Sequence, residues 1–170
     1  HIRIFNLLPG SKWLQDPDSE IPEGLDWNEW LGPAPYRPFN NGVVNGWFYY
    51  YAYNPGTLND ASHQLDLTRM IMGDPGHPRS IYGWGGNHIF HSERETPESQ
   101  SITYDFEKFT VTVDSGNATN YMSKTPQDIR MDPTRFPEWK TNADRIEIYG
   151  TLGMMYMGRT GGGWQVYGPG

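Results

Sequence analysis

Residues 53–73 read YNPGTLNDASHQLDLTRMIMG, and this stretch predicts a loop that runs into a helix. The dipeptide Pro55-Gly56 breaks any regular structure that precedes it. Three side chains of the kinds that cap the starts of helices come next: Asn59, Asp60 and Ser62. Gly73 is a typical helix stop. We therefore expect a helix of about three turns near the middle of the chain.

Helical spacing gives this helix two recognisable faces. Leu67, Met70 and Ile71 fall together on one face. His63 and Asp66 stand three positions apart and share another face. The helix dipole and the N–H groups at a helix start favour polar or anionic ligands, and an imidazole beside a carboxylate can move protons near neutral pH. Simple capping with a solvated histidine needs the same residue types, so both interpretations stay open at this point.

Length and composition restrict the class of protein. With 170 residues, the chain has the length of one domain with its own core, covering residues 1–170. Aromatic residues make up 15% of it, which favours a sheet with a ring-lined face over a helical bundle. No apolar run approaches the roughly 20 residues of a membrane-spanning helix. A net charge of −7 would repel a phosphate backbone, so nucleic acid is not an expected partner.

Several kinds of site are excluded by what the sequence lacks. The chain has no cysteine, which removes disulfides and thiolate sites and leaves both cytoplasm and periplasm open as its location. His88 and His91 would point to opposite faces of a strand, and His77 lies a whole strand away, so we expect no metal site. No G-x-G-x-x-G follows a strand, and residues 161–163 are interpreted as a turn, so this chain alone is expected to bind no nicotinamide cofactor.

Alternating apolar and polar residues predict an α+β fold with an open, mostly antiparallel sheet of about six strands. The predicted strands are residues 1–8, 78–90, 99–107, 109–113, 146–149 and 154–157, with a further edge strand at 164–167. Three glycines between 83 and 86 predict a bulge or a close approach of backbone. The central helix and a short helix around Trp27 and Trp30, with Asp26 as its N-terminal cap, are expected to pack on one face of the sheet. Residues 114–143 are polar and predict a long excursion.

Residues 47–53 read WFYYYAY, six aromatic residues in seven. As a strand, this run would place Trp47, Tyr49, Tyr51 and Tyr53 on one face. Tyrosine offers a flat apolar ring with a hydroxyl, which suits a sugar ligand, but an edge strand packed on the domain needs the same composition. Both interpretations remain open.

Three motifs resemble those of a known family. The run HQLDLTR at 63–69, after a glycine-containing loop, resembles the H-x-x-D-[LI]-x-R signature of the Gfo/Idh/MocA oxidoreductases, named after glucose-fructose oxidoreductase and inositol dehydrogenase. The segment GLDWNEWLGPAPYRPF at 24–39 resembles a G-L-D-W-x-x-W-L-G-P-A-P segment of one bacterial branch. YGTLG at 149–153 resembles the F-Y-G-T-x-G turn. The second of these motifs is the most specific.

The resemblance implies that the chain is a C-terminal domain. The preceding part would be a Rossmann domain that binds NAD or NADP, and this domain would cover the nicotinamide and supply the substrate site. Such proteins assemble as dimers or tetramers through the sheet face. The chain starts at His1 with a predicted strand and without an initiator methionine or signal peptide, which also indicates a piece of a longer protein.

The resemblance also implies site residues. Family members place a lysine of the Rossmann domain beside a histidine at this helix start, which is His63 here, and beside a carboxylate four residues before it. Position 59 is an asparagine, and the carboxylate of Asp60 stands only three before His63. Either Asp60 takes the acid role, or Asn59 binds a hydroxyl without accepting a proton. Asp66 is expected to orient His63.

The implied reaction is oxidation of a CH–OH group in a sugar or cyclitol substrate, with His63, Asp60 and Asn59 as catalytic residues and Trp47, Tyr51, Tyr53 and Asp66 as substrate-binding residues. Two alternatives come from other classes. One is a NAD-assisted glycoside hydrolase of the same family, since oxidation of a sugar carbon acidifies its neighbour and permits elimination. The other is a non-catalytic carbohydrate-binding or oligomerisation domain, which the aromatic run favours.

Overall fold

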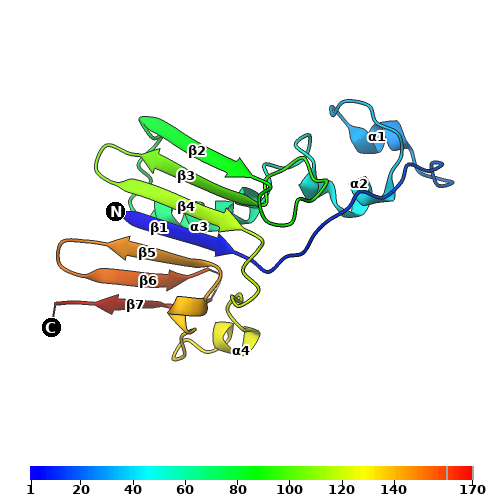
Figure 1. Cartoon of the computed structure of the whole chain (residues 1–170). Helices are drawn as coiled ribbons and strands as arrows, with labels where there is room; N and C mark the ends of the chain where they lie inside the picture. The colour runs from blue at the N-terminus through cyan, green and yellow to red at the C-terminus, as the bar shows by residue number, and fades with distance from the viewer. Residues whose placement is uncertain (160, 170) are drawn as a thin grey trace.

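A single seven-stranded sheet is the main element of the structure, which is a computed structural model describing residues 1–159 and 161–169. The strands follow the order β2-β3-β4-β1-β5-β6-β7 across the sheet (Figure 1). Their bounds are β1 Ile2–Leu7, β2 Ser80–Gly86, β3 Ser99–Asp105, β4 Thr110–Gly116, β5 Arg145–Tyr149, β6 Met154–Gly158 and β7 Trp164–Tyr167. The predicted edge strand at the end of the chain is therefore present, and it brings the expected six strands to seven.

The N-terminal strand β1 lies in the middle of the sheet. It pairs parallel with β4 and antiparallel with β5, and all other neighbouring pairs are antiparallel. Ile2 and Ile4 of β1 are buried, and so are their neighbours across the sheet, Val111, Val113 and Ile146. The α+β class and the mostly antiparallel sheet are thus confirmed.

Helix α3, Leu58–Ile71, packs across one face of the sheet over β1, β4 and β5. Its most buried positions are Ala61, Gln64 and Thr68, and Leu67 also packs on the core. Met70, however, is 67% exposed. It stands two positions beyond Thr68, which rotates it about 200° away from the buried stripe at 3.6 residues per turn. The apolar face expected from Leu67, Met70 and Ile71 therefore does not act as a packing unit.

A residue from the sheet, rather than one from the helix, caps the start of α3. The side-chain oxygen of Gln100 in β3 accepts hydrogen bonds from the Thr57 hydroxyl at 3.0 Å and from the Leu58 N–H at 3.3 Å. The three expected capping residues, Asn59, Asp60 and Ser62, lie inside the helix instead. The sequence pattern could not reveal this cap because Gln100 lies more than 40 residues further along the chain.

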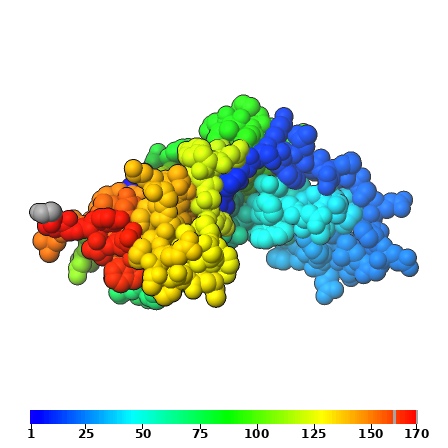
Figure 2. All heavy atoms as spheres, turned by 90° about the horizontal axis from the view of Figure 1, so that it is seen from below, coloured from blue at the N-terminus to red at the C-terminus, as the bar shows by residue number. Residues whose placement is uncertain are grey.

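Residues preceding α3 form a separate aromatic lobe beside the sheet, which we define as residues 11–53 (Figures 1 and 2). It contains α1 Trp27–Leu31, α2 Asn41–Asn45 and the short 3-10 helix η1 Trp47–Tyr49. Its core is a second apolar cluster made of Trp27, Leu31, Phe39, Val43 and Tyr50. Asp26 caps α1 as predicted, accepting the Glu29 N–H at 2.9 Å. The expectation that α1 packs on the sheet was wrong, because its indole rings fill the core of the lobe.

The aromatic run at 47–53 is not a strand. After η1 it continues through turns, with the N–H of Tyr50 donating to the carbonyl of Trp47 and the N–H of Asn54 donating to that of Tyr50. The Asn54 amide also binds the Phe48 carbonyl at 2.8 Å. These bonds wind the chain tightly, so the rings do not alternate between two faces: Tyr50 is buried in the lobe, whereas Trp47, Phe48 and Tyr51 are exposed.

β2 is an edge strand of seven residues, shorter than the predicted 78–90. Its pairing with β3 is continuous from Ser80 opposite Asp105 to Gly86 opposite Ser99, so no bulge interrupts it. A Cβ atom at Gly85 would lie 2.9–3.0 Å from Gln100 and Pro97, which explains why glycine is needed there. Because β2 ends at Gly86, His88 and His91 lie in a loop and not on a strand as expected.

The long excursion between β4 and β5 is confirmed, and it contains α4 Gln127–Arg130 and the 3-10 helix η2 Trp139–Thr141. Its last segment lies close to the C-terminal strands, where the Trp139 ring stacks on Tyr156 at 5.5 Å between centroids. Among the helices of the described residues, none has the length and apolarity needed to span a membrane.

Candidate functional site

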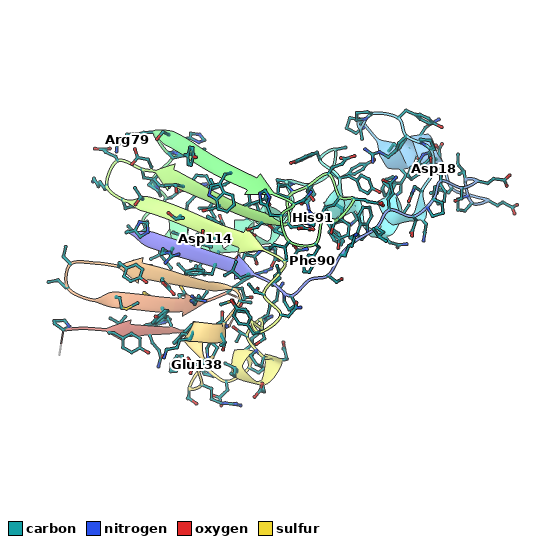
Figure 3. The ribbon with its side chains drawn as sticks, in the orientation of Figure 1. Asp18, Arg79, Phe90, His91, Asp114 and Glu138 are labelled. Carbon is teal, nitrogen blue, oxygen red and sulfur yellow. The ribbon has the colours of Figure 1, made fainter. Side chains whose placement is uncertain are left out.

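A pocket of about 350 Å³ opens where the start of α3 meets the aromatic lobe. Its wall consists of residues 8–11 after β1, helix η1, residues 54–60 at the start of α3, and the side chains of Arg94 and Asn117. The lobe and the sheet thus build the pocket together. Figure 3 shows this junction, near the labelled Phe90 and His91. The volume lies at the small end of the range for small-molecule sites.

The two candidate acid positions, Asn59 and Asp60, both line the pocket but differ in exposure. Asn59 lines the pocket and is exposed, and His63 stands one turn further on the same side of α3. Asp60 shares its side of the helix with Gln64, which is buried and donates to the Phe5 carbonyl at 3.3 Å. Asn59 and Asp60 stand four and three positions before His63, so both lie within one turn of it, and what distinguishes them is the set of partners of each side chain.

Asp60 lines the pocket, but both of its oxygens are engaged by cations. Arg159 donates to Oδ1 at 2.6 Å, and Lys124 donates to Oδ2 at 3.0 Å. Burial works to raise the pKa of this carboxyl, but the hydrogen bonds and charges of Lys124 and Arg159 outweigh burial and lower the pKa. Asp60 is thus held ionised, and it joins α3 to the segments that carry the two cations.

His63 and Asp66 are both exposed on α3. They do not line the pocket, whose wall on the helix ends at Asp60. His63 is one turn beyond Asn59 on the helix, and its side chain is open to solvent. Asp66 lies three residues further along the helix, within reach of His63.

The three aromatic residues proposed as ligand contacts are not brought together. Trp47 lines the pocket and is partly exposed. Tyr51 is 62% exposed and lies outside the pocket wall. The Tyr53 ring packs against Trp30 at 5.4 Å inside the lobe, and its hydroxyl is buried. Only Trp47 thus contacts the space beside Asn59.

Arg94 and Asn54 also line the pocket, and the sequence analysis did not identify either. Arg94 is 5% exposed and its guanidinium lies 4.8 Å from the centre of the Tyr49 ring. Burial lowers the pKa of Arg94, although the nearby Tyr49 and Glu98 oppose that effect. The run Arg94-Glu95-Thr96-Pro97 contains a proline-marked turn, and no periodic pattern in it indicates that Arg94 is buried.

No group of three or more histidine, aspartate or glutamate side chains in the described part of the chain is arranged to hold a metal ion. His88 and His91 lie in the loop after β2, with His91 in a left-handed backbone conformation at φ 51°.

Comparisons with known proteins agree with the motifs. Residues 9–119 match the family model described as the oxidoreductase family, C-terminal alpha/beta domain, of the Gfo/Idh/MocA group. The solved structure of yvaA from Bacillus subtilis, described as an oxidoreductase, aligns over 92% of this chain at 12% identity and a TM-score of 0.35. This chain spans 31% of the length of that protein. No curated protein matches the chain. Because the family model covers more than half of its residues, this chain belongs to the C-terminal domain family of the Gfo/Idh/MocA oxidoreductases.

Proposed function

We propose that the chain is the substrate-side domain of an NAD(P)-dependent oxidoreductase that acts on a CH–OH group of a sugar or cyclitol. The observation that carries this proposal is that Asn59 lines the pocket at the start of α3 and the exposed His63 follows it by one helical turn. A Rossmann domain preceding this chain would hold the cofactor. The side chain of His63 is open to solvent and so accessible to such a domain.

The residues of this chain suit the substrate half of such a reaction. NAD or NADP, when bound by the other domain, accepts the hydride from the carbinol carbon. His63 takes the proton from the substrate hydroxyl, since an imidazole can exchange protons near neutral pH. Asn59 holds that hydroxyl through its amide, which binds a hydroxyl but takes no proton. Asp60 fixes the helix start through Lys124 and Arg159.

Substitution of His63 tests the catalytic assignment in the protein that includes the cofactor domain. His63→Ala should lower kcat by roughly 10²- to 10⁴-fold, the usual contribution of a general acid–base group. The matched control is His77→Ala, because His77 is equally exposed but follows the far end of α3. Wild-type turnover by His63→Ala on its substrate would remove His63 from the mechanism.

A second pair of variants decides between Asn59 and Asp60. If Asn59 positions the hydroxyl, Asn59→Ala should lower kcat while leaving the thermal midpoint near that of the wild type. Asp60→Asn should instead lower the thermal midpoint, because it removes the carboxylate that Arg159 and Lys124 share. A changed pH profile of kcat in Asp60→Asn, without lost stability, would assign the acid role to Asp60.

The face of the sheet opposite α3 is proposed as the association surface of a dimer or tetramer. Thr103 and Thr112 lie opposite each other near its middle, and Arg3 pairs there with Asp114 at 3.0 Å (Figure 3). Exposed rings of Tyr82 and Trp84 in β2 lie on the same face, as the register places them opposite Thr103 and Ser101. An open sheet without a second layer commonly finds one in another subunit. A strictly monomeric full-length protein at micromolar concentrations in light scattering would contradict this.

Non-catalytic carbohydrate binding is the second candidate, and the exposure of Tyr51 and Trp47 favours it. Two measurements distinguish the candidates. Reduction of NAD or NADP by a sugar supports the oxidoreductase, whereas sugar binding without turnover supports the module. Release of an aglycone from a glycoside would instead indicate a NAD-assisted glycoside hydrolase of the same family.

A further inference from the structure

Arg94 is a buried cation whose hydrogen-bond acceptors are all neutral. It lies in the loop between β2 and β3 and lines the pocket at the start of α3. Its Nε and Nη2 donate to the Thr96 hydroxyl at 3.2 and 3.0 Å. Its Nη1 lies 2.9 Å from the Asn117 side chain, in the amide orientation that also lets Asn117 donate to the Glu98 carbonyl. Within residues 1–159 and 161–169, no carboxylate lies at ion-pair distance from Arg94.

The carboxylates on the same loop bind other donors. Glu93 accepts the Gln15 N–H at 2.9 Å. Glu95 accepts from Arg37 and from the Tyr51 N–H. Glu98 is fully buried and accepts the N–H groups of residues 89, 90 and 92 at 3.0–3.2 Å. None of the three is therefore available to Arg94.

A second arginine of the molecule shows what Arg94 lacks. The Arg37 guanidinium lies 4.5 Å from the centre of the Tyr50 ring, much as Arg94 lies 4.8 Å from that of Tyr49. Arg37, however, also pairs with Glu95 at 3.3 Å. Glu98 lies near enough to stabilise the charge of Arg94, but it does not contact the guanidinium. A buried charge without a directly paired counter-ion is costly, so the difference points to an anion bound in the pocket.

An unsatisfied acceptor lies in the same pocket wall. Asn54 is 4% exposed, and its Nδ2 donates to the carbonyls of Phe48 and Gly56 at 2.8 and 3.2 Å. These bonds fix the amide orientation and leave Oδ1 buried without a donor. A buried carbonyl oxygen of this kind is satisfied by a hydroxyl that enters the pocket.

The remaining charge in the pocket does not oppose an anion. Asp60 is its one acidic wall residue, and this carboxylate is neutralised by Arg159 at 2.6 Å and Lys124 at 3.0 Å. Lys124 and Arg159 also act on the buried Asp144, and Glu98 acts on Arg94 without contacting it. Of the charged residues in the pocket wall, Asp60 is ion-paired and Arg94 is not, so the wall presents an unpaired cation to an anionic ligand.

We propose that this pocket binds a sugar acid, with Arg94 holding its carboxylate and Asn54 Oδ1 accepting a hydrogen bond from one of its hydroxyls. The inference rests on the proposed function for the reaction, and it narrows the substrate class from neutral polyols to polyhydroxy carboxylates. A guanidinium has five N–H groups, and three are used by Thr96 and Asn117, which leaves two. One cation with two donors matches a monoanionic carboxylate better than a phosphate dianion.

Binding to the 170-residue chain is the first test, and it requires no turnover. Glucuronate, glucose and glucose 6-phosphate are titrated separately by nuclear magnetic resonance or calorimetry. Glucuronate should bind roughly 10- to 100-fold more tightly than glucose, the range of a hydrogen-bonded charged pair. Equal affinity for the two, binding of neither at millimolar concentration, or tighter binding of glucose 6-phosphate than of glucuronate would overturn the assignment.

Two variants identify the residue responsible. Arg94→Met removes the charge at similar length and should reduce the preference for glucuronate to about one. Arg37→Met is its matched control, since it removes an arginine that also stacks on a tyrosine ring but lies outside the pocket wall, and it should keep the preference. Circular dichroism checks that both variants are folded. Retention of the preference in Arg94→Met would contradict the proposal.

Asn117→Asp tests the role of Arg94 even if the Arg94→Met variant does not fold. It places a carboxylate of nearly the same shape beside Arg94 Nη1 and so provides an internal counter-ion. The preference for glucuronate should then disappear while Arg94 is still present, and an unchanged preference would count against the proposal.

Activity separates this inference from the proposed function. Oxidation of neutral sugars with no preference for acids would reject the sugar-acid site and keep the oxidoreductase. Binding of glucuronate that depends on Arg94, without reduction of NAD or NADP by any sugar or sugar acid, would keep the site and reject the oxidoreductase.

Discussion

The sheet and the aromatic lobe each have an apolar core, but the two cores are built from different kinds of residue. The core under α3 is aliphatic and periodic, with Ile2, Ile4 and Ile146 at alternate positions of paired strands. The lobe instead packs rings at irregular intervals, with Trp27 stacked on Trp30 at 4.8 Å and set edge-on against Phe39 at 5.1 Å. The residues of a regular core can be predicted from the spacing of apolar residues in the sequence. The residues of the ring-packed core depend on how the chain turns.

Hydrogen bonds of polar side chains stabilise the lobe, whereas backbone hydrogen bonds between strands stabilise the sheet. Trp27 donates its indole N–H to the Arg37 carbonyl at 2.8 Å, and the Asn40 amide caps α2 by accepting the Gly42 N–H at 2.8 Å. The lobe also reaches the β2–β3 loop through Glu95, which accepts from Arg37 and Tyr51. The pocket lies between the two regions. Substitutions in each region test whether the lobe and the sheet unfold independently.

The largest loss of stability is expected from Trp27→Ala. The side chain is 2% exposed, and deleting a buried aromatic side chain typically costs about 3–5 kcal/mol. Because the lobe has its own apolar cluster, hydrogen exchange should speed up first at lobe amides such as those of Gly32 and Val43. Equal acceleration at the amides of β1 would mean that lobe and sheet unfold as one unit.

A substitution in the sheet core should act on the whole molecule. Ile4 is fully buried between β4 and β5, so Ile4→Ala should lower the free energy of unfolding by about 2–4 kcal/mol. Urea unfolding followed by circular dichroism measures this loss. Protection in β1 and in α3 should fall together, and loss confined to β1 would contradict a shared core.

Asp60→Asn tests the ion pairs that join α3 to the segments carrying Arg159 and Lys124. Removing the charge that Arg159 and Lys124 share should cost about 1–3 kcal/mol at pH 7. Because the folded pKa of Asp60 is lowered, its contribution is fully present above the unfolded value of about 3.9 and disappears as the pH falls through the folded value. The difference in stability between wild type and variant should therefore shrink below about pH 4. A difference independent of pH down to pH 2 would contradict the ion pairs.

The smallest effect is expected from Met70→Ala. The side chain is on α3 but 67% exposed, so the substitution should change the free energy of unfolding by no more than about 0.5 kcal/mol. Thermal unfolding of the two proteins side by side is sufficient. A loss near 2 kcal/mol would show that Met70 is covered in solution, for example by another subunit.

Sequence alone determined the sheet and the family. Alternation at 99–107, 109–113 and 146–157 predicted the hairpins, because a strand with one buried face must repeat every two residues. The motifs at 24–39 and 63–69 predicted the family that the comparisons then showed. Asp26 was likewise identified as a cap, since capping is decided within four residues.

Tertiary structure alone decided the lobe and the polar chemistry of the pocket. Residues 47–53 have the composition of a strand, but hydrogen bonds made by Asn54 and its neighbours wind them into turns. Gln100 caps α3, and Asp60 meets Arg159 99 positions along the chain. Arg94 becomes a buried cation because the lobe closes over it with Tyr49. The spacing of residues along the sequence cannot predict such contacts, because the partners are distant in sequence and meet only when the sheet and the lobe pack together.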